Sequence, residues 1–368
     1  MSGLRVAASA RFFIAAAAAC LTASCARGEA EEFDHANLSG LTASTESNLY
    51  RRIEAVIVEQ DGAILYERYF GDTTPETRID ARSAGKSITA LAVGIAIDRD
   101  DIESLDAPVY RFFSDRAPFA DDGPLKNSIT VRDLLSMSSA LDCDDWRDSP
   151  GNEEKMYETP DWSRFALDIP TAKNYARGAG GFGRFSYCTA GAFLLGRIVE
   201  RASGQPFENF VQSSIFEHLR ITNPVWKRAP NGEVQSGGQL SLRARDFLAL
   251  GRLVRDGGVI GSRKIVSQAW LSEMLAPHLR ATSDEDYGYL WWRRTFQSVK
   301  TGHVGHYMSG NGGNKVVVLP SLRAVVVILS TNYNQKNMHQ QTTEILEKHI
   351  LPALEALEPG TPRAAPSP

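Results

Sequence analysis

A serine and a lysine three residues apart form the strongest chemical signal in the chain. Ser83-Ala84-Gly85-Lys86 spells S-x-x-K, which occurs nowhere else in the sequence. On a helix this spacing puts both side chains on one face, where a lysine can share or remove the serine proton. The alternative is an ordinary helix start with Ser83 as its cap and Lys86 exposed. The apolar run that follows, SITALAVGIAID, disfavours the alternative because it leaves Lys86 little surface toward water.

The elements that must position these residues follow an apolar N-terminus. The run FFIAAAAACLTASC comes after two arginines and is typical of an export signal, which we place at residues 1–25. The run is too short to span a bilayer permanently. Thr22-Ala23-Ser24-Cys25 also resembles a lipobox, in which Cys25 would carry a lipid anchor. The sequence therefore predicts an exported, periplasmic protein; a buried N-terminal helix is the alternative, and the polar segment after it disfavours that reading.

Composition narrows the class of partner. The formal net charge of −4 provides no basic surface for nucleic acid, so we do not expect nucleic acid as a partner. The seven histidines show no metal-binding spacing, and we expect neither a metal nor another cofactor. Beyond Cys20 and Cys25 the chain has only Cys143 and Cys188, which are either one disulfide or two small buried hydrophobes. The sequence carries no signal for an oligomeric state.

Hydrophobic patterns predict a sheet built from both ends of the chain. RRIEAVIVEQDGAILYERYFG and NKVVVLPSLRAVVVILSTN each contain two β-branched runs around a turn, and MHQQTTEILEKHILPALEAL has the period of a covering helix. Between them, apolar residues at three- and four-residue spacing predict helices. We therefore expect a fold of α/β plus all-α class: an antiparallel sheet flanked by helices, with an inserted helical lobe over roughly residues 100–245. We expect an N-terminal linker at residues 26–48 before this fold and a disordered tail at residues 356–368 after it.

A second motif, near the middle of the chain, indicates a resemblance to a known family. Phe185-Ser186-Tyr187-Cys188-Thr189-Ala190-Gly191 opens another apolar helix about a hundred residues after the serine. Together with GKSITALAVGIAID, ITVRDLLSMSSAL, GQLSLRARDFLALGRLV, YGYLWW and SGNGG before VVVLP, it resembles the serine β-lactamase superfamily. The branch is that of class C β-lactamases, DD-peptidases, esterases and 6-aminohexanoate-dimer hydrolases. The resemblance implies a β-lactamase/transpeptidase-like hydrolase domain over residues 49–355.

The resemblance implies roles for individual residues. Ser83 would be the acylated nucleophile, Lys86 its proton partner, and Tyr187 the general acid/base of a Y-x-N motif. A cation beside Tyr187 would favour its phenolate. Thr189 stands where the family has asparagine, so β-lactam recognition is in doubt and a hydroxyl would face the substrate instead. Cys143 follows a turn that lies beside the active site in this family, and a disulfide with Cys188 would tie that turn to the tyrosine.

Two candidate versions of the family's third motif lie close together. Lys300-Thr301-Gly302 spells K-T-G and 303–305 spells H-x-G, but the strand that enters the Gly-rich turn before VVVLP is 305–309. The K-T-G therefore falls in a hairpin turn, and H-x-G is out of register. We expect backbone N–H groups at Met308, Ser309 and Gly310 to complete an oxyanion hole with that of Ser83.

The predicted function is acyl transfer by a serine hydrolase. A Ser83 ester would form from small esters or linear amides, as in esterases and 6-aminohexanoate-dimer hydrolases. The alternatives are a β-lactamase or DD-peptidase and, in a different class, a penicillin-sensing binding protein that is acylated without turnover.

Overall fold

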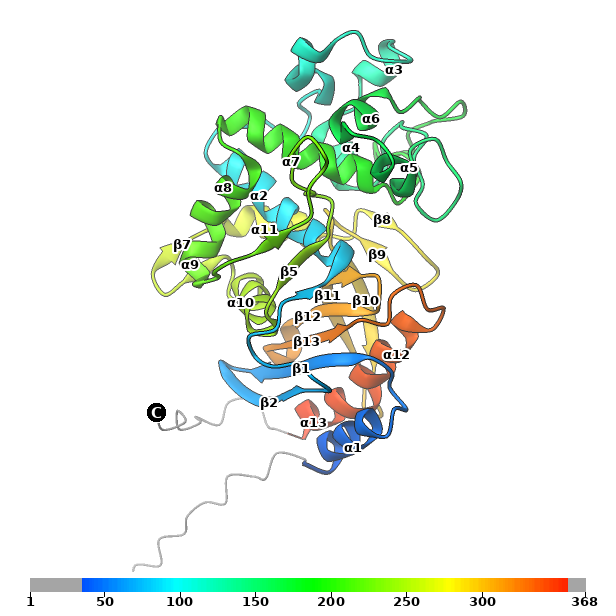
Figure 1. Ribbon diagram of the computed structural model, residues 1–368. Helices are drawn as coiled ribbons and strands as arrows, with labels where there is room; N and C mark the ends of the chain where they lie inside the picture. The colour runs from blue at the N-terminus through cyan, green and yellow to red at the C-terminus, as the bar shows by residue number, and fades with distance from the viewer. Residues whose placement is uncertain (1–34, 357–368) are drawn as a thin grey trace, which may run out of the picture. The chain divides into compact units, whose positions relative to one another are not determined.

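The computed structural model describes residues 35–356, which Figure 1 colours from blue to red. The predicted signal peptide 1–25, including Cys25, and residues 357–368 of the predicted tail lie outside the described residues. None of the helices between residues 35 and 356 has the length and apolar composition needed to cross a membrane.

An eight-stranded antiparallel sheet joins the two ends of the chain, as the β-branched runs predict (Figure 1). The strand order is β2-β1-β13-β12-β11-β10-β9-β8. In the first hairpin Asp61 and Gly62 both have positive φ, 51° and 89°, as a tight two-residue turn requires. The strands are β1 (Ile53–Gln60), β2 (Ala63–Tyr69), β8 (Leu279–Arg280), β9 (Asp286–Tyr287), β10 (Trp292–Gln297), β11 (Gly302–Gly310), β12 (Asn314–Leu319) and β13 (Ala324–Ser330).

Helices cover both faces of the central strands. β12 and β13 are buried along their whole length, which explains their nearly continuous valine content. Helix α10 (Ala244–Arg255) packs on β12 and β13 so closely that a Cβ on Gly251 would lie 2.5 Å from Val325 and 3.1 Å from Val316. The opposite face receives the predicted C-terminal helix, which runs as α12 (Met338–Ile345), a π-helical turn η5 (Leu346–Ile350) and α13 (Leu351–Glu355).

The segment 26–48, predicted as a linker, contains a packed helix. Helix α1 (His35–Glu46) buries Leu38 and Leu41 and contacts η5 and α13. Thr42 Oγ1 lies 2.8 Å from the Tyr66 hydroxyl of β2. The linker prediction was wrong because the segment has only two leucines in a polar sequence, and their partners lie at the far end of the chain.

The inserted lobe is mainly helical, as predicted. Helices α2 and α7 pack against each other at its base, and Gly204 ends α7 with a φ of 70°. In the stretch TVRDLLSMSSAL the helix α4 (Val131–Leu135) is short, and Met137 after it adopts a left-handed conformation with φ of 55°. The helices are η1 (Arg82–Gly85), α2 (Lys86–Asp98), η2 (Val109–Arg116), α3 (Pro124–Asn127), α4 (Val131–Leu135), α5 (Glu153–Tyr157), α6 (Trp162–Asp168), α7 (Thr189–Ser203), α8 (Phe207–Val211), η3 (Gln212–Phe216), α9 (Glu217–Leu219) and α11 (Gln268–Leu275).

Short strands and turns complete the described chain. Strands β3, β5 and β4 form a three-stranded sheet that leads directly into η1, and β6 and β7 form a small hairpin after α10. Their bounds are β3 (Ile79–Asp80), β4 (Val225–Trp226), β5 (Leu240–Leu242), β6 (Val259–Ile260) and β7 (Arg263–Lys264), and the turn η4 (Pro320–Leu322) joins β12 to β13.

Candidate active site

Ser83 and Lys86 meet at the start of helix α2. Ser83 lies in the 3-10 turn η1 and Lys86 is the first residue of α2, so the predicted spacing places both on one face. Lys86 Nζ donates to Ser83 Oγ at 2.9 Å and to the Gly237 carbonyl at 2.6 Å. Lys86 is 1% exposed, which excludes the alternative of an ordinary solvent-facing helix start. The arrangement gives the serine a proton partner held in place by a backbone carbonyl.

Tyr187 completes the cluster from the loop before α7. Lys86 Nζ lies 5.0 Å from the centre of its ring. Burial raises the pKa of Tyr187, and the charge of Lys86 and a hydrogen bond with Ser83 only partly oppose that rise. Lys86 favours the phenolate, as expected, but burial outweighs it, and the resting residue is therefore a protonated phenol. A phenol in this place can donate a proton to a leaving group.

A cavity of about 800 Å³ opens over Ser83 and Tyr187. One of its walls is aromatic: the Tyr187 ring stacks with Trp146 at 5.5 Å and with Trp292 at 5.9 Å between centroids. Trp146 is 56% exposed despite its size, so it can contact a bound molecule. Sequence analysis did not single out Trp146, whose loop position carries no periodic signal.

Strand β11 contributes a further part of the cavity lining next to the serine. Ser309 and Gly310 line the cavity with Ser83, whereas the Met308 side chain is buried beneath and does not. Gly310 lies against η1, where an added Cβ would come within 1.9 Å of the Ala81 carbonyl oxygen. The backbone at the end of β11 therefore touches the turn that holds Ser83, the arrangement that an oxyanion hole at these two places would need.

Neither version of the third motif lies in the cavity. Gln297 pairs with Gly302, so Lys300 falls in the turn between β10 and β11, as predicted. His303, at the start of β11, hydrogen-bonds with Ser321 and Glu355 instead of facing Ser83. The lysine that does line the cavity is Lys315 of β12, which stands opposite Ser309.

Thr189 lies beneath the cavity wall and is not part of its lining. It is 1% exposed, and its backbone N–H donates to Asp145 Oδ2 at 2.6 Å. Asp145 and Glu153 line the cavity, whereas the sequence had led us to expect the Thr189 hydroxyl there. Burial, reinforced by the charge of Glu153, raises the pKa of Asp145 to about 6 against the opposing effect of Lys86.

Acidic groups outnumber basic groups around the cavity. Its basic lining residues are Arg294, which lies 3.5 Å from Asp284 and 3.7 Å from Glu285, Lys315 and His339. Burial lowers the pKa of His339 to about 3, so that it is uncharged. Burial lowers the pKa of Lys315 to about 7, although Glu285 opposes the change. The carboxylates of the lining are Asp145, Glu153, Asp284, Glu285, Glu344 and Glu347. The cavity thus presents a negative field to whatever enters it.

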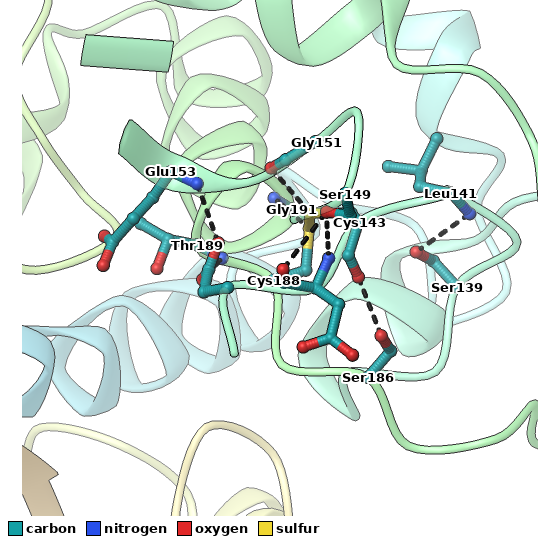
Figure 2. The surroundings of a disulfide bond; sticks show 12 residues. Ser139, Leu141, Cys143, Ser149, Gly151, Glu153, Ser186, Cys188, Thr189 and Gly191 are labelled. Carbon is teal, nitrogen blue, oxygen red and sulfur yellow. Dashed lines mark hydrogen bonds between the residues drawn. A yellow bond between two sulfur atoms is a disulfide. The ribbon is translucent and has the colours of Figure 1, made fainter. Parts of the chain in front are cut away.

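A disulfide joins Cys143 to Cys188, next to Tyr187 (Figure 2). Their Cα atoms are 5.4 Å apart. Ser186, which precedes Tyr187, donates its Oγ hydrogen to the Cys143 carbonyl at 2.8 Å. The bond ties the irregular chain after α4 to the residues that carry the tyrosine, and it is the disulfide rather than the alternative of two small buried hydrophobes.

Comparisons with known proteins agree with this fold. The family described as Beta-lactamase matches residues 50–350, and the chain belongs to that family of serine hydrolases. A 6-aminohexanoate-dimer hydrolase of Paenarthrobacter ureafaciens is 28% identical over 296 residues, which are 76% of this chain and 72% of that protein.

Solved structures share the fold at low sequence identity. An octameric penicillin-binding protein homologue from Pyrococcus abyssi has a TM-score of 0.65 and 21% identity, covering 85% of this chain and 76% of that one. EstCE1, a hydrolase with promiscuous acyltransferase activity, has a TM-score of 0.67 and 17% identity, covering 85% of this chain and 99% of that one.

Proposed function

We propose that this hydrolase cleaves small esters or linear amides through an acyl-enzyme on Ser83. The observation that carries the proposal is the 2.9 Å contact between Lys86 Nζ and Ser83 Oγ. Tyr187 lies beside both residues and lines the cavity. The related protein from Paenarthrobacter ureafaciens bears the name of an enzyme that acts on a linear amide dimer, which supports the amide part of the proposal.

The reaction uses Ser83 and Tyr187, which line the cavity, and the buried Lys86, which contacts Ser83. For the attack, the Lys86–Tyr187 pair must hold one proton fewer than when both side chains are protonated; it then accepts the Ser83 proton as Oγ attacks the substrate carbonyl carbon. The negative charge that develops on the carbonyl oxygen is stabilised by backbone N–H groups of Ser83 and of the end of β11. The phenol of Tyr187 then protonates the departing alcohol or amine, and water hydrolyses the Ser83 ester by the reverse sequence of proton transfers.

The charge of the cavity favours neutral or cationic substrates over β-lactams. A penicillin or cephalosporin carries a carboxylate close to its reacting carbonyl, and six carboxylates line this cavity against Arg294 and Lys315. Lys300 of the K-T-G sequence lies in a distant turn and offers that carboxylate no partner. We therefore rank β-lactamase or DD-peptidase activity, and penicillin sensing without turnover, below ester and amide hydrolysis.

A chromogenic ester distinguishes these possibilities. The full chain should release p-nitrophenol from a neutral p-nitrophenyl ester in steady turnover, and only slowly open a chromogenic cephalosporin. A burst of one equivalent followed by no further release would instead identify a binding protein. Ser83→Ala should abolish labelling by a serine-directed phosphonate, and Lys86→Ala should lower kcat by about 10³-fold or more, as for members of one catalytic unit. Labelling that survives in Ser83→Ala would refute the mechanism.

We also propose that the protein works outside the cytoplasm. The apolar run of residues 12–25 is typical of an export signal, and a disulfide such as Cys143–Cys188 persists in oxidising compartments. Fractionation of cells that express the full chain, with mass determination of the mature N-terminus, tests both the export and a lipid on Cys25.

A further inference from the structure

Four contacts join the segment around Asp145 to the segment that carries Tyr187. The Asp145 N–H donates to the Tyr187 carbonyl at 2.8 Å, and the Asp145 carboxylate accepts the Thr189 N–H at 2.6 Å. Ser186 and Cys188, on either side of Tyr187, bind Cys143 through a hydrogen bond and the disulfide. Tyr187 is therefore held at its own carbonyl and on both neighbours by one short stretch of chain.

The carboxylate of Asp145 makes a second contact, and no other side chain of its size would reproduce both contacts. Its second oxygen, Oδ1, accepts the Glu153 N–H at 2.9 Å at the start of α5. Thr189 is the first residue of α7, so one carboxylate satisfies backbone donors at the start of two helices. An ionised carboxylate offers two acceptor oxygens, whereas an amide of the same shape offers one.

The next residue couples this network to the substrate cavity. Trp146 stacks on the Tyr187 ring with planes 6° apart, and both rings line the cavity. A shift of Asp145 would therefore move the phenol and the aromatic wall together. Displacements of about 1 Å in a catalytic group lower rates by about 100-fold.

We propose that Asp145 is a positioning residue that fixes Tyr187 over Ser83 and Lys86 through its backbone N–H and its ionised carboxylate. The inference rests on the proposed role of Tyr187 in acyl transfer. Asp145 itself exchanges no proton with the substrate in this scheme.

The ionisation of Asp145 gives the proposal a signature in the pH profile. The groups that face it are Lys86 of α2, Glu153 and Tyr157 of α5, and Tyr187. Burial raises the pKa of Asp145 to about 6, so the carboxylate loses its charge when the pH falls through that value. Above it, the ionised form accepts both N–H groups and holds Tyr187 in place, so kcat should be higher.

The test compares Asp145→Asn with Asp148→Asn. Asp148 lies on the same loop, is 90% exposed and pairs only with Lys155 among the described residues, so it matches the chemical change without touching Tyr187. Asp145→Asn should lower kcat on a neutral ester by about 10- to 100-fold, since a hydrogen bond to a charged group is lost, with KM changed less than about threefold. The step near pH 6 in the kcat profile should disappear in Asp145→Asn and persist in Asp148→Asn.

The pH profile of kcat for the unaltered protein and the activity of the Tyr187→Phe variant distinguish a failure of the positioning role from a failure of the proposed function. If Tyr187→Phe is inactive while Asp145→Asn keeps kcat within about threefold and retains the step, the positioning role is overturned and the proposed function stands. If Tyr187→Phe is fully active, the proposed role of the tyrosine fails, and this inference fails with it. A kcat loss in Asp145→Asn with the step unmoved would show a merely structural role and would also overturn the proposal.

Discussion

Gly310→Ala should damage the site more than its small size suggests. Gly310 ends β11 against the turn that carries Ser83, and an added Cβ would lie 1.9 Å from the Ala81 carbonyl oxygen and 3.1 Å from the Ala84 nitrogen. Carbon and oxygen atoms do not approach within about 3 Å, so the strand or the turn must move by about 1 Å. The oxyanion donors and the nucleophile would then separate by that distance.

The expected loss follows from this displacement. A 1 Å misplacement costs about 100-fold in rate, and overpacking costs about 1–3 kcal/mol of stability. Turnover of a neutral p-nitrophenyl ester and thermal unfolding would measure the two effects separately. Gly123→Ala is the matched control, because its φ of 173° suits any residue and nothing lies within 4 Å of the added Cβ. If Gly310→Ala kept kcat/KM within about threefold of the unaltered protein, the assignment of the oxyanion hole to the end of β11 would be wrong.

Three further changes test other parts of the structure. Lys300→Ala should alter stability by no more than about 0.5 kcal/mol and leave kcat/KM on neutral and acidic esters within about threefold, because Lys300 lies in a surface turn; a large loss confined to the acidic ester would contradict that register. Replacing both Cys143 and Cys188 with alanine should cost about 4 kcal/mol in urea unfolding, since the bond closes a loop of 45 residues; two reactive thiols in the unfolded, unreduced protein would show that no bond forms. Lys315 has a folded pKa of about 7, below its unfolded value of about 10.4, so the unfolded chain binds the extra proton and stability should rise from pH 7 to pH 10; Lys315→Met should lose that rise in Tm, and an unchanged pH dependence would refute it.

The proximity of Ser83, Lys86 and Tyr187 could be predicted from the sequence because their local spacing and neighbouring residues are distinctive. Ser83 and Lys86 are three residues apart on one helix, and Tyr187 opens a second helix with a distinctive neighbourhood. Both ends of the sheet were predictable because valine-rich strands around turn residues repeat a simple period. The position of K-T-G followed from counting back from the Gly-rich turn, which is also local information.

The remaining features depend on contacts between distant segments. Asp145 and Trp146 lie in an irregular loop, and only its path past Tyr187 reveals their place in the cavity wall. Thr189 was expected to face the substrate because it follows the tyrosine by two residues, but the start of α7 turns it beneath the wall. The lysine in the cavity comes from β12, and no spacing in the sequence distinguishes Lys315 from a surface lysine.

The pairing of β1 with β13 means that the active site is among the last parts of the molecule to form. Residue 53 pairs with residue 330, so the central sheet stays incomplete until nearly the whole chain is synthesised. Lys86 and Tyr187, which hydrogen-bond with the Ser83 side chain, both follow it in sequence. Gly237, which accepts a hydrogen bond from Lys86, and Gly310, which lies against the turn of Ser83, come later still. Long-range pairings of this kind form slowly. A nascent chain therefore carries the nucleophile for most of its synthesis without the neighbours that would make it reactive.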